Sequence, residues 1–380
     1  MTDRTDEPLL LTPGPLTTSR TTKEVMLRDW GSRDGEFIAM NARVRDHLVE
    51  LAGGAETHTA ILLQGAGTFA VEAMIGTLVP RQGKLLILIN GAYGRRMAQL
   101  SKVIGRTYVT LETPEDTPPD PAAVAAVLAA DPAVTHVAMV YCETTSGLLN
   151  PLAEVAVVVA AAGRRLLIDA MSAFGALPCD AREIRYDALV SSFNKCLEGV
   201  PGAAFVICRR AALEAAAGNA HSVVLDLHDQ WVFMERAGQW RFTAPTHVIA
   251  AFDRALAEHA AEGGIAGRGA RYRRNCQVLI AGMRAMGFRT LLPDALQAPI
   301  IVTFHIPSDP RFAFEEFYDR LRRRGYVIYP GKVTAADTFR IGCIGRLSEA
   351  DMRGALTAIR GVLDEMGVRV PVAAVAASSL

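Results

Sequence analysis

Short apolar runs alternate with helix-like segments through the first half of the chain, from about Ile61 to Cys208. ILLQG, KLLILIN and RTYVTLE are each followed by such a segment: TFAVEAMIGTLV, GAYGRRMAQLSKVIG and DPAAVAAVLAAD. THVAMVYCE precedes PLAEVAVVVAAAG, and RRLLIDAM, ALVSSF and AAFVIC complete the strand candidates. Because continuous apolar strands that alternate with helices form sheets covered on both faces, the pattern predicts an α/β fold with a mainly parallel sheet.

The second half of the chain changes to a long helical stretch and then to a smaller mixed region. FDRALAEHAAEGG and RNCQVLIAGMRAMG form the helical stretch, PIIVTFHI, FEEFYDRLRRRGYVIYP and TFRIGCIG follow, and a last helix is expected over 348–366. We expect a large domain over residues 16–265 and a smaller α+β domain over 266–370, with residues 1–15 packed against the smaller one. The tail PVAAVAASSL is expected to be loose.

The composition favours a globular enzyme and argues against several other classes. Forty acidic residues balance forty basic ones, so no basic surface for nucleic acid is indicated. The acidic, polar start MTDRTDEPLL does not resemble a secretory signal, and no apolar run is long enough to span a membrane. The six cysteines are scattered without a CxxC pair, which indicates buried thiols rather than disulfides or a zinc site. We therefore expect a cytoplasmic enzyme without a metal.

The segment QGAGTFAVEA, residues 64–73, places glycines between an apolar strand and a helix. Glycines allow the backbone to approach a phosphate, and the helix start supplies free N–H groups. Gly65, Gly67 and Ala70 also match the dinucleotide-binding pattern GxGxxA, but the next strand ends in Asn90, where that site needs an acidic residue. No GK[ST] follows, so a Walker A loop is excluded. A tight turn without a ligand is the remaining alternative.

Two charged residues, Asp169 and Lys195, follow later apolar strands. A buried carboxylate needs a partner, and a pyridinium N–H is one candidate, with a helix N-cap as the alternative. Lys195 is one of only five lysines among 40 basic residues, and its flanks in SSFNKCLEGVPGAAFVI do not resemble a solvated face. A desolvated lysine can lose its proton and form a Schiff base. Together with the phosphate turn, these two residues indicate pyridoxal 5′-phosphate (PLP) as the cofactor.

Segments along nearly the whole chain resemble one known family, the class V, fold-type I PLP-dependent aminotransferases. The similar segments are LLLTPGPLTTSRTTKEVMLRDW, LLQGAGTFAVEA, NGAYGRRM, ETTSGLLNP, IDAMSAFGALP, SSFNKCLEGVPG, WRFTAPTH and VIYPGKVTAADTFRIGCIG. The resemblance implies the aspartate aminotransferase-like fold, with seven strands in the large-domain sheet. It also implies a homodimer with active sites at the subunit interface.

The resemblance assigns a role to individual residues. Lys195 would bind PLP and serve as acid and base, and Asp169 would bind the pyridine nitrogen. The other cofactor contacts would come from Gly67 and Thr68 at the phosphate, Tyr93 on the ring, Thr145 near the ring oxygen, Asn194 near the phosphate, and Thr243 of the neighbouring subunit. Arg340 would bind the substrate anion, because its planar guanidinium suits a carboxylate or phosphonate. A core position for Tyr93 and a surface position for Arg340 are the alternatives.

Within this family, TPGPLTTSR, WRFTAPTH and YPGKV are similar to members that transfer the amino group of 2-aminoethylphosphonate to pyruvate in phosphonate catabolism. Another class V aminotransferase, acting on alanine or serine with glyoxylate or pyruvate, is the alternative. A cysteine desulfurase would need an exposed cysteine, whereas Cys343 lies in an apolar strand. Ser19, Arg33 and Lys332 lie in segments similar to the family and are candidates for contacts with the phosphonate, but the sequence does not assign them individually.

Overall fold

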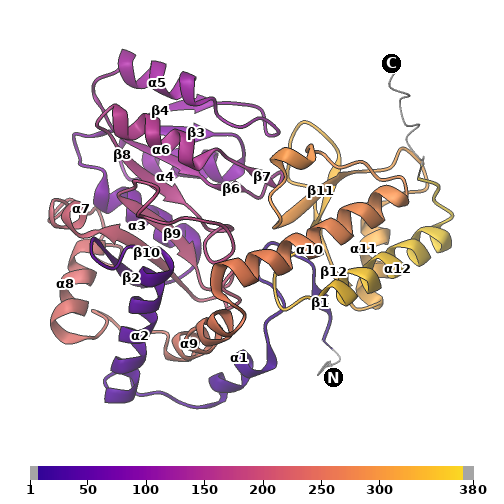
Figure 1. Ribbon diagram of the computed structural model, residues 1–380, viewed down its shortest axis with the longest axis horizontal. Helices are drawn as coiled ribbons and strands as arrows, with labels where there is room; N and C mark the ends of the chain where they lie inside the picture. The colour runs from indigo at the N-terminus through magenta and orange to yellow at the C-terminus, as the bar shows by residue number, and fades with distance from the viewer. Residues whose placement is uncertain (1–6, 371–380) are drawn as a thin grey trace.

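The computed structural model describes residues 7–370 of the chain, and its largest element is a seven-stranded sheet (Figure 1). In spatial order the strands are β2 (His58–Gln64), β10 (Ala203–Arg209), β9 (Ala188–Ser192), β8 (Arg165–Asp169), β5 (Val134–Val140), β3 (Lys84–Ile89) and β4 (Thr107–Glu112). β10 is antiparallel to β2 and β9, and the remaining pairs are parallel. The predicted mainly parallel sheet and all seven of its strands are confirmed.

Alternate residues of the central strands face two separate hydrophobic clusters. In β3, Leu86 and Leu88 belong to the first cluster, whereas Leu85 and Ile87 belong to the second. The first cluster includes side chains of α2 (Gly35–Leu51), α5 (Pro121–Ala130), α6 (Leu152–Ala161) and α9 (Thr246–Ala261). The second cluster includes side chains of α3 (Gly67–Leu78), α4 (Ala92–Val103) and α7 (Arg210–Glu214). One further helix, α8 (Leu227–Ala237), contributes to both clusters. Because strand side chains alternate between faces, the sheet is the middle layer of three.

The long helical stretch expected in the second half is divided into α9 and α10 (Gly264–Ala285). Gly263, with a φ of 96°, lies between the two helices, and Gly264, with a φ of 64°, is the first residue of α10. Left-handed residues cannot continue a right-handed helix, and glycine adopts this conformation without a side-chain penalty. The apolar periodicity on both sides concealed this break in the sequence.

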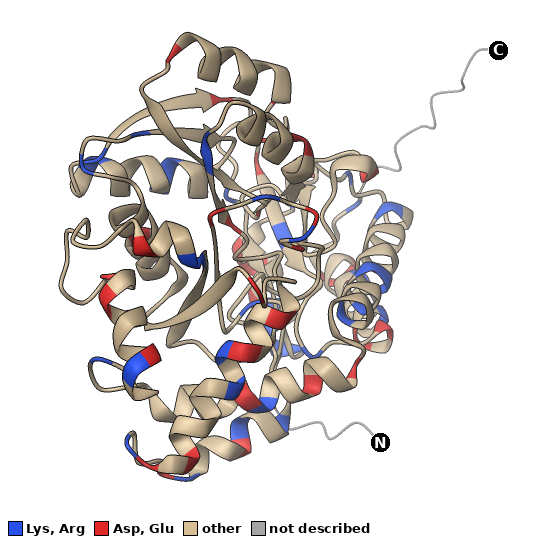
Figure 2. Ribbon diagram, turned by 60° about the vertical axis from the view of Figure 1, so that its left-hand side comes forward, with Lys and Arg blue, Asp and Glu red and all other residues tan. Residues whose placement is uncertain are grey.

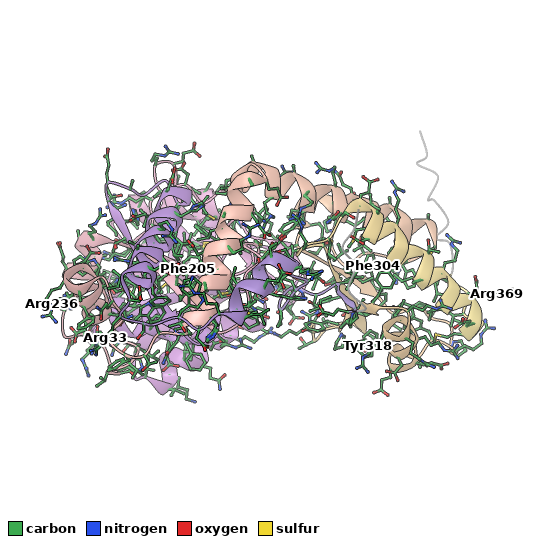
Figure 3. All side chains as sticks on the ribbon, turned by 90° about the horizontal axis from the view of Figure 1, so that it is seen from below. Arg33, Phe205, Arg236, Phe304, Tyr318 and Arg369 are labelled. Carbon is green, nitrogen blue, oxygen red and sulfur yellow. The ribbon has the colours of Figure 1, made fainter. Side chains whose placement is uncertain are left out.

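A third hydrophobic cluster lies in a smaller part of the molecule. Phe304 belongs to it, whereas Phe205 belongs to the first cluster, and the two lie well apart along the long axis (Figure 3). The small part contains a three-stranded sheet of β11 (Ile301–His305), β14 (Thr338–Gly342) and β13 (Tyr329–Pro330). It also contains the strand pair β1 (Leu9–Leu10) and β12 (Tyr326–Val327). The helices that contribute to its cluster are α10, α11 (Phe314–Arg323) and α12 (Glu349–Met366). The division of the chain at residues 265 and 266 stays a prediction. Residues 1–6 and the tail 371–380 lie outside the described residues.

The remaining short elements connect these layers. They are α1 (Arg20–Glu24), the 3₁₀ helices Val25–Leu27 and Asp294–Leu296, and the strand pair β6 (Cys142–Glu143) and β7 (Leu148–Leu149). Charged positions lie mainly on the helices and loops, and few lie on the strands (Figure 2). Within residues 7–370, no helix has the length and apolar character needed to cross a membrane.

Candidate active site

The predicted site residues gather where the strands of the large sheet end. β2 leads to Gly67 and Thr68, β8 ends with Asp169, and β9 leads to Asn194 and Lys195. β2 and β9 run in the same direction because both are antiparallel to β10, so their carboxyl ends lie at the same edge of the sheet. Ligands of α/β sheets bind at this edge. Three segments far apart in the sequence therefore meet at one position.

Lys195 lies in the turn after β9, and the N-terminal segment covers its amine. Nζ donates hydrogen bonds to the carbonyl oxygens of Pro13, at 3.1 Å, and Gly14, at 3.2 Å. A Cβ on Gly14 would lie 2.6 Å from Cδ and 2.8 Å from Nζ of Lys195, so only glycine permits this approach. Burial lowers the pKa of Lys195, and the nearby groups of Tyr93 and Asp169 partly oppose this shift.

Asp169 is buried, and one of its carboxylate oxygens remains open. Oδ1 accepts a hydrogen bond of 2.9 Å from the N–H of Met171, the kind of bond expected if Asp169 only capped a turn. Among the described residues, Oδ2 has no hydrogen-bond partner. Burial raises the pKa of Asp169 to about 6, with a further contribution from the Glu143 carboxyl. A protonated ring nitrogen at Oδ2 would stabilise the charged carboxylate, which suits the role implied by the resemblance.

The start of α3 offers free backbone donors to an anion. Ala66 precedes the helix without a side-chain cap, and the N–H groups of Gly67 and Thr68 have no hydrogen-bond partner within residues 7–370. A Cβ on Gly67 would lie 2.4 Å from Met171 Cε, so the end of the Met171 side chain packs directly on this turn. The Thr68 hydroxyl accepts a hydrogen bond of 3.1 Å from Nη1 of Arg96. Helix dipole, free amides and a guanidinium together favour a phosphate here.

Glu143 is a buried carboxylate to which the sequence assigned no role. Oε1 accepts hydrogen bonds from the N–H and the hydroxyl of Thr145, at 2.9 and 2.6 Å, and Oε2 accepts one of 3.3 Å from the N–H of Tyr93. The Thr145 hydroxyl also accepts one of 2.9 Å from the N–H of Ala92. Burial raises the pKa of Glu143. These bonds fix the start of α4 against the loop that carries Thr145, a contact that no local sequence signal reveals.

The ring of Tyr93 lies among positive charges. Lys332 Nζ lies 4.1 Å, and the Arg96 guanidinium carbon 5.1 Å, from the centre of the ring. Although burial raises the pKa of Tyr93, a hydrogen bond with Thr144 and the charges of Lys332 and Lys195 outweigh it and lower the pKa overall. The ring is only half-buried and packs partly against the second cluster. It is thus placed at the rim of the site rather than inside the core.

Arg340 lies on β14 with its guanidinium at the same loop. Only 6% of the residue is exposed, so the alternative of a surface arginine is wrong. Nε donates to the carbonyl oxygen of Pro330 at 3.0 Å, and Nη1 donates to that of Thr144 at 2.8 Å. Among the described residues, Nη2 has no hydrogen-bond partner and Arg340 forms no ion pair. Burial lowers the pKa of Arg340, and the nearby groups of Tyr93, Tyr329 and Glu143 oppose this shift only in part.

Two predicted cofactor contacts are placed differently from the rest. The amide of Asn194 lies beside the lysine and accepts a hydrogen bond of 3.0 Å from the Ser192 hydroxyl. Thr243 is exposed in the loop between α8 and α9, and within residues 7–370 it forms no hydrogen bond with the residues at the strand ends. Its role on a neighbouring subunit stays a prediction.

These groups fit PLP better than a dinucleotide. Free amides at α3, an open carboxylate oxygen on Asp169 and an enclosed amine on Lys195 match a phosphate, a ring nitrogen and an aldehyde. A dinucleotide would need an acidic residue after β3, but Asn90 stands there and its Nδ2 donates to Oδ1 of Asn150 at 2.7 Å. Cys343, which a desulfurase would need to expose, is buried, and a hydrogen bond with Cys276 together with burial raises its pKa.

We expect Gly14→Ala to weaken PLP binding, because the added methyl group would collide with the Lys195 side chain. The φ of Gly14, 117°, also disfavours alanine. Strain of about 1–3 kcal/mol would lower the affinity for PLP roughly 5- to 150-fold. Titration of the apoprotein with PLP, followed by absorbance, measures the change. Gly35→Ala is the control, since a Cβ there meets no atom within 4 Å; equal affinities of both variants and wild type would contradict the placement of Gly14.

The raised pKa of Asp169 predicts a pH-dependent stability of the apoprotein. A carboxyl group that binds its proton more tightly in the folded state gives stability that is complete below its unfolded pKa and is lost as the pH rises through the folded value. The affected window runs from the ordinary 3.8 to about 6. Asp169→Asn should therefore gain in melting temperature relative to wild type as the pH rises from 4 to about 6 and stay level above about 7. A constant difference across this window would show that Asp169 is not desolvated.

Comparison with known proteins gives a consistent assignment. Residues 20–345 match the model of the family described as aminotransferase class-V. A 2-aminoethylphosphonate–pyruvate transaminase of Pseudomonas fluorescens is 56% identical over 95% of this chain and 98% of its own. A protein of Burkholderia lata with the same description is 55% identical over 96% of both chains.

Solved structures share the fold. The pyridoxamine–pyruvate aminotransferase of Mesorhizobium loti superposes with a TM-score of 0.87 and 25% identity, covering 96% of this chain and 94% of its own. The alanine–glyoxylate aminotransferase of a Nostoc species gives a TM-score of 0.88 at 23% identity, covering 96% and 97%. The α/β architecture expected from the resemblance is thereby confirmed. The chain belongs to the class V aminotransferase family.

Proposed function

We propose that the protein transfers the amino group of 2-aminoethylphosphonate to pyruvate and produces phosphonoacetaldehyde and L-alanine. The observation that carries this proposal is the 56% identity, over 95% of the chain, to a relative described as a transaminase of these two substrates. The buried Arg340, which has no carboxylate partner among the described residues, supports an anionic substrate. The reaction places the protein in phosphonate catabolism, and its six buried, free thiols are compatible with a cytoplasmic location.

PLP would be held by the groups that the strand ends bring together. The amides of Gly67 and Thr68 would bind its phosphate, with Asn194 nearby, and Oδ2 of Asp169 would accept a hydrogen bond from its ring nitrogen. Tyr93 would contact the ring. When bound, PLP supplies a carbonyl carbon that takes up the amino group and a ring that accepts an electron pair.

Thr145 would act close to the ring oxygen. Its hydroxyl donates to Glu143 and accepts from the N–H of Ala92, so its position is fixed before any ligand arrives. A hydroxyl held in this way does not need to be ordered when the cofactor binds, which lowers the entropic cost of binding.

Lys195 would move the proton in both halves of the reaction. Nζ would take a proton from the amine-bearing carbon of 2-aminoethylphosphonate as a base and then give it up again as an acid. With pyruvate the same amine moves a proton in the reverse direction, and the product is L-alanine. Burial lowers the pKa of Lys195, so that more of the amine is neutral at working pH, as a general base requires.

Both substrates end in an anion, so one guanidinium can serve both half-reactions. Arg340 presents Nη2 without a partner in the described part of the chain, while Nε and Nη1 are fixed by the carbonyl oxygens of Pro330 and Thr144. An arginine held by two bonds offers its remaining donors in one direction. The alternative is a class V enzyme that uses alanine or serine with glyoxylate or pyruvate, since the same lysine and carboxylate would serve that reaction.

We also propose a homodimer in which each subunit completes the site of the other. Thr243, the predicted phosphate contact, is exposed and forms no hydrogen bond with the described residues of this chain's own site. Two large apolar side chains are exposed beside predicted phosphate contacts: Phe69, next to Thr68, is 52% exposed, and Phe242, next to Thr243, is 47% exposed. Exposed aromatic side chains of this kind favour a protein interface.

Purified protein, mixed with 2-aminoethylphosphonate and pyruvate, is expected to form L-alanine, which chromatography with mass detection quantifies. Activity with alanine and glyoxylate but none with 2-aminoethylphosphonate would contradict the proposed substrate while leaving PLP chemistry intact.

Arg340→Ala should slow both half-reactions roughly 30-fold or more, because each anion loses its charged partner. Single-turnover absorbance measures each half separately. Arg322→Ala, at an exposed position of α11, is the control, and an undiminished Arg340→Ala variant would exclude the shared role.

Hybrid dimers test the shared site. Lys195→Ala abolishes the site of its own subunit, and Thr243→Glu should repel the cofactor phosphate in the site of the neighbour. Each variant alone is expected to be inactive or strongly impaired. When both are co-expressed, half of the dimers are hybrids with one intact site, so about one quarter of the wild-type activity should return. No recovery, although size-exclusion chromatography shows mixed dimers, would contradict the role of Thr243.

A further inference from the structure

Lys332 and Arg340 belong to the same hairpin, in which Arg340 lies on β14 and Lys332 lies in the loop between β13 and β14. Tyr329 pairs with Arg340 across this hairpin, and Pro330 pairs with Phe339. The N–H of Gly331 donates to the carbonyl oxygen of Thr338 at 2.9 Å, and the loop begins there. Lys332 is thus the second residue after Pro330, whose carbonyl oxygen accepts the Nε bond of Arg340.

Lys332 and Arg340 border the same group of side chains. Lys332 Nζ lies 4.1 Å from the centre of the Tyr93 ring, and Nη1 of Arg340 donates to the carbonyl oxygen of Thr144. Tyr93 and Thr144 are adjacent in space, because the N–H of Tyr93 donates to the neighbouring Glu143. Both cations therefore lie beside the contact between the start of α4 and the loop of residues 143–145.

The loop that carries Lys332 is fixed to the large sheet by a buried carboxylate. Oε2 of Glu115 accepts hydrogen bonds from the N–H and the hydroxyl of Thr334, at 2.7 and 3.3 Å. Oε1 of the same residue accepts one of 3.0 Å from Nη1 of Arg95, two residues after Tyr93 on α4. Lys332 is therefore held near Tyr93 by bonds on both sides of the loop, and its position does not depend on the ring contact alone.

Neither cation has a carboxylate partner within ion-pair distance in residues 7–370, whereas Lys23 and Lys84 pair with Glu7 and Asp131. Arg340 is buried and Lys332 is half-buried. Charges removed from water are normally paired, so two cations without an ion-pair partner at the same group of side chains indicate a site for an anion. The nearest carboxylate of the cluster, Glu143, is already occupied by the donors of Thr145 and Tyr93.

We infer that Lys332 determines specificity by supplying, beside Arg340, the second positive charge that favours a doubly charged phosphonate over a singly charged carboxylate. This inference rests on the proposed function. One guanidinium matches the charge of a carboxylate, whereas a phosphonate, like a phosphate ester, carries close to two negative charges near neutral pH. The ammonium of Lys332 contributes the additional attraction, so its loss penalises the phosphonate more than the carboxylate.

The test compares the two half-reactions in Lys332→Met. In single-turnover absorbance, kcat/KM for 2-aminoethylphosphonate should fall at least about tenfold, while the value for L-alanine, whose anion is a carboxylate, should change less than about threefold. Lys332→Arg keeps the charge and should retain most of the phosphonate rate. Lys102→Met is the matched control, because this lysine is exposed on α4, away from the site.

Each outcome separates the inference from the proposed function. If the wild type does not react with 2-aminoethylphosphonate at all, the proposed function fails and the inference fails with it. If the wild type reacts and Lys332→Met slows both half-reactions equally, Lys332 only supports Tyr93 and the fold, and the inference alone is overturned. An unchanged phosphonate rate would overturn it as well. The absorbance of bound PLP in each variant shows that cofactor loss does not cause the difference.

Discussion

The site depends on one constraint, a lysine amine held out of water against two backbone carbonyl groups. The carbonyl oxygens of Pro13 and Gly14 accept hydrogen bonds from Lys195 but carry no full charge to neutralise it. Arg340 and Lys332 also lack a carboxylate partner within residues 7–370, and burial raises the pKa of the two nearby acids, Asp169 and Glu143. The strand ends thus hold more positive than negative charge. A cofactor phosphate and an anionic substrate are the groups that would balance it, so cofactor and substrate recognition follow from the same electrostatic condition.

The turn that carries Lys195 is itself held by buried ion pairs from α10. Nη1 of Arg268, which is 1% exposed, donates to the carbonyl oxygen of Cys196 at 2.6 Å. Glu198, whose φ is 59°, accepts hydrogen bonds from Tyr272 and Arg271 at 2.6 and 2.7 Å. Buried ion pairs add little stability, but they fix geometry when all partners are satisfied. α10 therefore connects the smaller part of the molecule to the turn with the lysine. Cys196 serves here through its backbone, since its thiol is buried in the first cluster.

The sequence predicted the sheet well and the site only in part, for physical reasons. Strands such as KLLILIN are buried on both faces, so their apolar runs identify them without tertiary information. Lys195 and Asp169 stood out because charged residues are rare at the ends of such runs. Glu143 also ends an apolar run, but its bond with α4 could not be predicted, and the place of the Lys332 loop depends on a contact of Thr334 with Glu115, which is distant in the sequence. The break at Gly263 was missed because the helical periodicity continues on both sides.

Borohydride labelling shows whether the enclosed amine of Lys195 is the group that binds PLP. Protein loaded with PLP is reduced with borohydride, digested and analysed by peptide mass spectrometry. We expect loss of the absorbance near the visible edge and a pyridoxyl group on the peptide that contains Lys195, and on no other lysine. A pyridoxyl group on Lys332 or another lysine, or no covalent label at all, would contradict it.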